Sequence, residues 1–119
     1  MTPNEKSKVL SEALPYIKEF FGKTIIIKFG GNAMIDKRLK QSFAKDLVLL
    51  KLVGMNPVVI HGGGPQINES LAKSGEKPIF QEGIRVTNKK TLEIVINVLN
   101  EGNQQIIDLV RDNGGDAKS

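Results

Sequence analysis

Two short apolar runs that lead directly into glycines constrain the fold of this chain more than any other feature. Residues 24–34 read TIIIKFGGNAM, and residues 57–67 read PVVIHGGGPQI. Continuous apolar runs of this kind are typical of strands covered on both faces of a parallel sheet. Because glycine lacks a Cβ, the turns that follow can bring backbone N–H groups close to an anion. The sequence therefore predicts two strands whose glycine turns face one anionic ligand.

Helical spacing of apolar residues recurs between and after these strands, in residues 37–54, 65–74 and 91–112. Alternation of strand and helix predicts an α/β fold with a mainly parallel sheet flanked by helices. We expect Gly102 to bend or split the last helix, because glycine inside a helix costs about 1 kcal/mol relative to alanine. Residues 79–86 predict a short hairpin around Glu82–Gly83, and the last residues of the chain are expected to begin another strand.

The N-terminal segment, residues 4–21, has the apolar spacing of an amphipathic helix. We expect Pro15 to interrupt and kink it, because proline removes a backbone donor and clashes with the preceding turn. Gly22 fits a C-terminal cap. The pattern alone leaves open whether the helix packs on its own core or forms an arm that packs on another subunit.

Bulk properties narrow the function classes. A length of 119 residues predicts one domain. The net charge of +4 is modest and scattered, and aromatic residues make up only 5%, which disfavours nucleic-acid binding. The absence of cysteine excludes disulfides and thiolate metal sites and is compatible with a reducing cytoplasm, where we expect the protein to reside. We expect neither a signal peptide nor a membrane span, since no sufficiently apolar run occurs.

The string HGGGP at residues 61–65 is the strongest local signal for chemistry. An anion bound at a helix N-terminus would meet unpaired N–H groups and a favourable helix dipole. The alternative is a turn that only packs strand against helix, but three consecutive glycines exceed what such a turn needs. The string fits neither GxxxxGK[ST] nor GxGxxG, so neither a Walker A loop nor a dinucleotide site is supported. For His61 we predict a hydrogen bond that orders the turn rather than catalysis or metal binding.

Two cations are candidates for the site. Lys28 ends the first apolar run, at the carboxyl end of a strand where parallel sheets bind ligands. A lysine there suits a transferring phosphoryl group, whereas the alternative is a solvated strand-end lysine. Arg85 lies in GIRVT and would be either a bidentate clamp on a carboxylate or half of a surface ion pair. No Ser–His–Asp set, Cys–His set or metal cluster can be assembled from the sequence.

The motifs IKFGGNAM at residues 27–34, HGGGPQ at 61–66 and GIRVT at 83–87 closely resemble, in order and spacing, those of the acetylglutamate kinases in the amino acid kinase superfamily. The resemblance covers almost the whole chain. It implies a three-layer αβα fold and ATP-dependent phosphorylation of the side-chain carboxylate of N-acetyl-L-glutamate in arginine biosynthesis. Carbamate and aspartate kinases share the first motif but look different at the later ones, so they are weaker alternatives.

The resemblance also implies roles for individual residues. Lys28 would stabilise charge on the transferring phosphoryl group in the transition state. Backbone N–H groups would hold the ATP phosphates at Gly30 and Gly31 and the N-acetyl-L-glutamate at Gly63 and Gly64. ATP with Mg²⁺ is the implied co-substrate, with no tightly bound cofactor and no metal site of the protein itself. Arg85 would clamp the α-carboxylate of the substrate.

Length is the main departure from the family pattern. Members of the family are about twice as long, so the resemblance implies a truncated chain without the C-terminal, nucleotide-binding half. Residues 23–119 would form the substrate-binding domain, and the isolated chain is expected to be inactive as a kinase. Asn100–Gln105 also departs from the Gly-Lys-x-Asn pattern common in the family. A non-catalytic module for substrate binding or assembly is therefore the alternative for the isolated polypeptide.

Residues 1–22 add a second resemblance. VLSEALPYIKEFFGK is similar to the kinked N-terminal helix of the arginine-inhibited subclass, which interlaces dimers into hexamers. This similarity favours an oligomerisation arm over a helix packed on its own core. The expected partners are therefore N-acetyl-L-glutamate, ATP and further copies of the chain, without nucleic acid or membrane.

Overall fold

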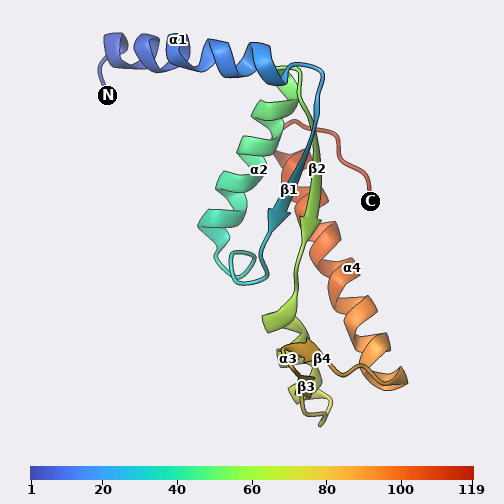
Figure 1. The fold of residues 1–119 in the computed structure, drawn as a ribbon. Coiled ribbons are helices and arrows are strands. Elements are labelled where there is room, and N and C mark those ends of the chain that lie inside the picture. Colours follow the sequence, from blue (N-terminus) through green and yellow to red (C-terminus); the bar gives the residue numbers. More distant parts are fainter.

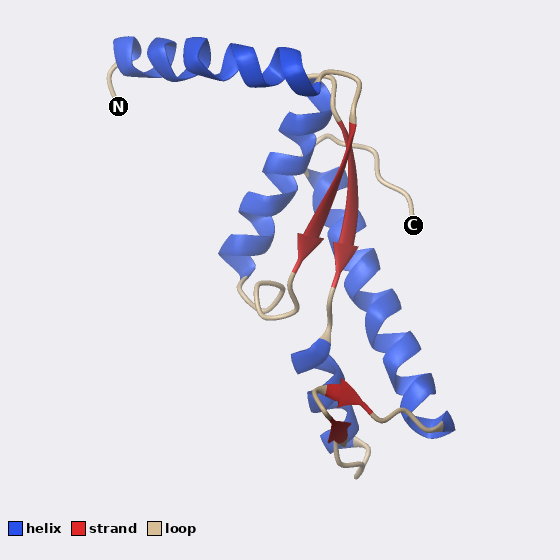
Figure 2. Ribbon diagram, in the orientation of Figure 1, coloured by secondary structure: helices blue, strands red, loops and turns tan.

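The computed structural model describes all 119 residues. Helices and strands alternate along the chain as predicted, with one short hairpin before the last helix (Figures 1 and 2). The elements are α1 (Pro3–Phe20), β1 (Thr24–Phe29), α2 (Lys37–Leu52), β2 (Asn56–His61), α3 (Gly64–Lys73), β3 (Phe80–Gln81), β4 (Ile84–Arg85) and α4 (Lys89–Asp112).

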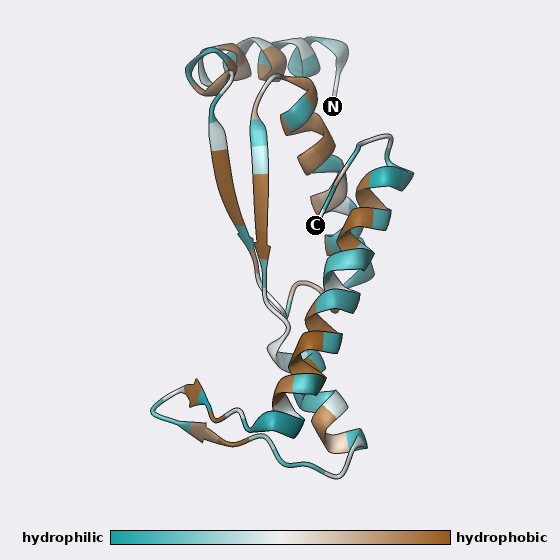
Figure 3. Cartoon of the chain, turned by 90° about the vertical axis from the view of Figure 1, so that its right-hand side faces the viewer, coloured by the Kyte–Doolittle hydropathy of each residue, from teal (hydrophilic) through white to brown (hydrophobic).

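Strands β1 and β2 form a two-stranded parallel sheet, in register from Thr24 opposite Asn56 to Phe29 opposite His61. Helices α2 and α4 pack together on one face of this sheet, and Figure 3 shows both strands on the same side of these helices. The α/β class is thus confirmed. No helix of this chain covers the opposite face, so the expectation that both faces of each strand are covered is not met here. Its apolar side chains are exposed, at 68% for Ile26, 47% for Val58 and 55% for Ile60.

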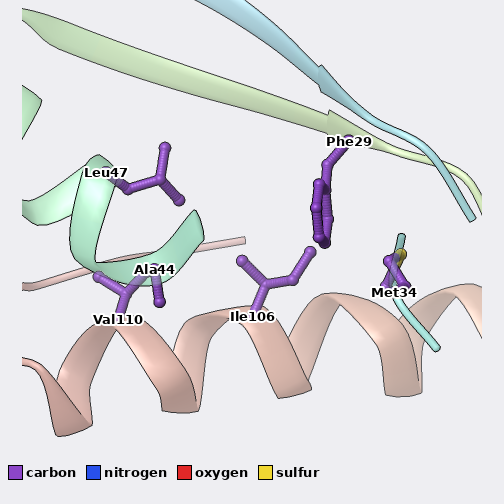
Figure 4. Close-up of a cluster of buried hydrophobic side chains, with 6 residues drawn as sticks. All are labelled: Phe29, Met34, Ala44, Leu47, Ile106 and Val110. Atoms are coloured by element: carbon purple, nitrogen blue, oxygen red, sulfur yellow. The ribbon is translucent and has the colours of Figure 1, made fainter. Parts of the chain in front are cut away.

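The main hydrophobic cluster lies between the covered sheet face and the two helices (Figure 4). Its buried members are Phe29, Met34, Ala44, Leu47, Ile106 and Val110. The Phe29 ring stacks on Phe43, with ring centroids 4.0 Å apart. Phe29 precedes the first glycine turn and Met34 ends it, so the core anchors that turn on both sides. Burial of each of the larger side chains in this cluster stabilises the fold by roughly 1.5–3 kcal/mol.

Helix α4 runs unbroken through Gly102, so the expected split is not seen. Side chains from outside the helix approach the glycine closely. A Cβ at this position would lie 3.0 Å from the Met34 Cε atom and 3.5 Å from the His61 Cε1 atom. The expected strand at the end of the chain is also absent, because residues 114–119 have no regular secondary structure.

Helix α1 is a free-standing arm that projects away from the sheet (Figure 1). It begins with a capping box between Thr2 and Glu5 and continues through Pro15, so the predicted interruption is not seen. None of its residues is buried. Its exposed apolar side chains include Val9, Leu10, Leu14 and Tyr16. No helix of the protein is both long enough and apolar enough to cross a lipid bilayer.

The predicted hairpin is confirmed, with β3 and β4 pairing Phe80 with Arg85 and Gln81 with Ile84. The two residues of the turn, Glu82 and Gly83, have φ angles of 50° and 78°. Positive φ at both central positions suits the right-handed twist of a short hairpin. The hairpin lies next to α3 in Figure 1, and Arg85 of β4 contacts Asn68 of α3.

Candidate functional site

The two glycine turns lie against each other at the carboxyl end of the sheet. Because β1 and β2 are parallel and in register, they end side by side, and the Gly62 amide donates to the Phe29 carbonyl at 3.0 Å. A Cβ at Gly31 would lie 3.1 Å from the backbone nitrogens of Gly63 and Gly64. The turns therefore meet through main-chain atoms, and residue 31 has no room for a side chain without a shift of its neighbours.

Both turns present unpaired main-chain donors. The amides of Gly30, Gly31, Gly63 and Gly64 donate no hydrogen bond within the chain. Two of these groups belong to the start of α3, where Gly63 is the N-cap and no side chain caps the helix. An anion near this end would be attracted both by the free N–H groups and by the helix dipole. The four glycines predicted to bind phosphate or substrate thus lie together in space.

Lys28 lies next to these turns, one residue before the end of β1 and opposite Ile60 of β2. Side chains alternate along the strand, so Lys28 shares the open sheet face with Ile26, whereas the next residue, Phe29, is buried. Lys28 is exposed and has no ion-pair partner in the chain. Its cationic charge is therefore available to an anion bound at the end of the sheet.

His61 orders the second turn, as predicted. Its Nδ1 atom lies 3.0 Å from the Gly62 carbonyl oxygen, and its Nε2 atom lies 3.4 Å from the Asn103 side-chain nitrogen. A single neutral tautomer satisfies both contacts: Nδ1–H donates to Gly62, and Nε2 accepts from Asn103. His61 thereby links the second turn to α4. In addition, no cluster of three His, Cys, Asp or Glu side chains is arranged to hold a metal ion.

Arg85 is held by two neighbours that sequence reasoning missed. Its Nη2 donates to the Asn68 Oδ1 atom at 2.6 Å, and its guanidinium carbon lies 4.6 Å from the centre of the Phe80 ring. Arg85 forms no ion pair, and its buried Nη1 atom has no hydrogen-bond partner. The surface ion pair considered from the sequence is therefore not observed. Asn68 lies one helical turn beyond Gly64, so Arg85 reaches the start of α3 through this contact rather than by touching the glycines.

Gln66 is a further residue that sequence reasoning did not single out, although it ends the HGGGPQ motif. Its side-chain Nε2 donates to the Gly31 carbonyl oxygen at 3.1 Å, across from α3 to the first turn. Local sequence patterns give no signal for a contact between residues so far apart in the chain. Gln66 also lines a cavity of about 210 Å³ between α3 and α4.

The fold and the paired glycine turns agree with a comparison against known families. Residues 23–118 match the amino acid kinase family, and the chain belongs to that family. The match covers both glycine turns, Lys28 and Arg85.

Curated relatives define the similarity more narrowly. The chain is 60% identical to the acetylglutamate kinase of Methylobacillus flagellatus over 98% of its own length and 40% of the relative. It is also 60% identical to the acetylglutamate kinase of Chromobacterium violaceum, over 95% of this chain and 39% of that protein. The chain therefore spans about 40% of the length of the curated relatives it matches.

Solved structures support the fold. An N-acetylglutamate synthase from Neisseria gonorrhoeae, solved with coenzyme A and N-acetyl-glutamate, superposes with a TM-score of 0.77 at 24% identity, over 87% of this chain and 24% of the synthase. The smu.665 protein of Streptococcus mutans superposes with a TM-score of 0.62 at 26% identity, over 76% of this chain and 37% of that protein.

Proposed function

We propose that this chain is the substrate-binding part of an acetylglutamate kinase, which transfers the γ-phosphoryl group of ATP to the side-chain carboxylate of N-acetyl-L-glutamate in arginine biosynthesis. The observation that carries the proposal is the pair of touching glycine turns with four unpaired amides beside an unpaired lysine. The high identity to acetylglutamate kinases over nearly the whole chain supports the choice of substrate.

The proposed chemistry relies on positioning and on neutralisation of charge. Phosphoryl transfer requires the donor and the acceptor in line, and negative charge on the transferring oxygens must be stabilised. Gly30 and Gly31 hold the ATP phosphates, while Gly63 and Gly64 hold the reacting end of N-acetyl-L-glutamate. Lys28, one residue before the first turn, stabilises the transferring group. Mg²⁺ enters with the nucleotide and neutralises further phosphate charge.

Arg85 binds the α-carboxylate of N-acetyl-L-glutamate in this proposal. Two observations support this role: Arg85 has no acidic partner in the chain, and one of its terminal nitrogens lacks any hydrogen-bond partner. A buried donor without a partner is costly, and a carboxylate that reaches the guanidinium would relieve this cost. Asn68 and Phe80 fix the plane of the guanidinium before the substrate arrives.

Helix α1 is proposed to join copies of the protein, as a dimer or a hexamer. The helix buries none of its own residues, yet it carries exposed apolar side chains such as Leu10, at 73%, and Leu14, at 52%. An isolated helix of this length gains little stability from its own hydrogen bonds. Packing of its apolar side chains against another copy would supply the missing stability.

A chimera tests the catalytic proposal directly. Residues 1–119 of this chain replace the matched part of the Methylobacillus flagellatus acetylglutamate kinase, and ADP formation is measured with and without N-acetyl-L-glutamate. We expect activity that depends on N-acetyl-L-glutamate. Lys28→Ala should lower kcat roughly 10²–10³-fold, as loss of a charge-stabilising group does, with little change in the KM for N-acetyl-L-glutamate.

Lys23→Ala is the matched control, because Lys23 is also exposed and lies just before the opposite end of β1. It should leave kcat unchanged. An inactive chimera would contradict the kinase proposal and favour a non-catalytic binding or assembly module. An active chimera with an unchanged kcat after Lys28→Ala would show that Lys28 is only a solvated lysine.

A further inference from the structure

Gln66 makes the only side-chain hydrogen bond between the first glycine turn and the helix that follows the second. Its Nε2 donates to the Gly31 carbonyl oxygen at 3.1 Å. That carbonyl accepts no backbone hydrogen bond, so Gln66 is its sole partner in the chain. Beyond the Gly62-to-Phe29 bond at the strand ends, no backbone hydrogen bond joins residues 30–36 to residues 62–74.

The first turn needs such a contact because its own hydrogen bonds are local and few. The amides of Ala33 and Met34 both donate to the Gly30 carbonyl, and the Ile35 amide donates to Asn32. None of these bonds fixes the turn relative to α3. Close approach of the main chains sets a lower limit on the separation of the turns, but it does not prevent them from moving apart. The hydrogen bond from Gln66 to Gly31 does resist such a movement.

We propose that Gln66 is a positioning residue that holds the two glycine turns at the separation needed for transfer between their ligands. This inference rests on the proposed function, in which the first turn binds ATP phosphates and the second binds N-acetyl-L-glutamate. Gln66 acts through the Gly31 carbonyl and touches neither ligand. Because the Gly31 carbonyl and the Asn32 N–H belong to one planar peptide unit, the bond from Gln66 also fixes the direction in which the Asn32 N–H points.

The second polar atom of the Gln66 side chain also indicates a role beyond packing. Its Oε1 atom is buried and has no hydrogen-bond partner within the chain. A buried amide oxygen without a partner is uncommon in folded proteins. A glutamine with no role beyond packing could be replaced by an apolar side chain of the same shape at little cost. We therefore attribute the presence of an amide side chain at residue 66 to its one hydrogen bond, with the Gly31 carbonyl.

Gln66→Met tests the proposal, because methionine keeps the length of the side chain and loses its donor. In the chimera we expect kcat to fall roughly tenfold to a hundredfold, since small misplacements of reacting groups have effects of this size. The KM for N-acetyl-L-glutamate should change much less. Gln104→Met is the matched control, because Gln104 is exposed on α4 and bonds only to Asp108 within its own helix.

Hydrogen exchange in the 119-residue chain tests the contact without substrates. Loss of one hydrogen bond should speed exchange of the Ala33, Met34 and Ile35 amides about twofold to tenfold after Gln66→Met, but not after Gln104→Met. Unchanged exchange would overturn the proposed contact. Wild-type kcat in Gln66→Met would overturn its role in transfer. An inactive wild-type chimera would instead contradict the proposed function, and the exchange result would still decide the contact.

Gln66→Glu provides a second readout that a purely structural role would not give. A carboxylate cannot donate to the Gly31 carbonyl and would repel it, whereas the protonated carboxyl can donate. The kcat of this variant, relative to wild type, should therefore rise as pH falls through the pKa of the introduced carboxyl. A constant ratio across pH would count against the contact, including in the case where Gln66→Met fails to fold.

Discussion

Gly31→Ala should destabilise the chain by forcing the glycine turns apart. The new Cβ would lie 3.1 Å from Gly63 N, Gly64 N and the Pro65 Cδ atom. The first two are backbone atoms and the third belongs to a rigid ring, so none can move by a simple change of rotamer. Overpacking of this kind typically costs about 1–3 kcal/mol.

An opposing term reduces the net effect. Alanine restricts the unfolded chain more than glycine does, which stabilises the folded state by about 0.4–1 kcal/mol where the backbone conformation allows it. The net loss for Gly31→Ala is then between about 0 and 2.6 kcal/mol. Gly30→Ala is the matched control, because its Cβ would have no atom within 4 Å and its φ is not in the left-handed region.

The assay is urea unfolding of the two variants and the wild type, followed by circular dichroism. The entropy term is common to both alanines, so their difference isolates the contact between the turns and should be about 1–3 kcal/mol. Gly30→Ala should be as stable as the wild type or slightly more so. Equal stability of the two variants would refute the conclusion that the turns are in van der Waals contact.

Three further predictions concern the substrate, the isolated chain and the arm. In the chimera, Arg85→Lys keeps the charge but loses the planar fork, so the KM for N-acetyl-L-glutamate should rise roughly tenfold to a hundredfold with kcat nearly unchanged; a normal KM would remove Arg85 from the site. The purified 119-residue polypeptide spans only about 40% of the length of its curated relatives and should show negligible kinase activity, because transfer requires both whole reactants to be held in line; robust ADP production that depends on N-acetyl-L-glutamate would contradict this. Removal of residues 1–20 from the chimera should reduce the number of copies in its assembly, as measured by light scattering; an unchanged number would show that α1 is not an oligomerisation arm. The same deletion in the 119-residue chain should leave its thermal midpoint almost unchanged, since α1 buries no residue.

Features with local causes were predictable from the sequence. The apolar runs of β1 and β2 identify strands, and the glycines that follow them identify turns, because both depend on a few neighbouring residues. The hairpin at Glu82–Gly83 is of the same kind, since its positive φ angles favour glycine at the second position. The gathering of Gly30, Gly31, Gly63 and Gly64 also follows from local pattern, because parallel neighbouring strands end at the same edge of a sheet.

Features that depend on contacts between distant segments were not predictable. Gly102 in α4 was expected to weaken its helix, but the structure shows it accommodating Met34 and His61. Asn68, Phe80 and Gln66 support the site through side-chain contacts that have no periodicity. The sequence also did not predict that one face of the sheet is open in this chain. An apolar run indicates that a strand is suited to burial on both faces, but it does not indicate which segment covers each face.

The candidate site consists largely of main-chain groups, so its geometry depends on α4, the helix that packs against both turns. Backbone N–H groups bind anions whatever the side chains are, so their performance depends on where the turns lie. Gly102 allows α4 to approach Met34 of the first turn and His61 before the second, within 3.0 and 3.5 Å of a Cβ at that position. One turn earlier in the same helix, the Leu99 Cδ2 atom would lie 3.0 Å from a Cβ at Gly63. One helix therefore packs against both turns, so a change in its position would change the geometry of the site.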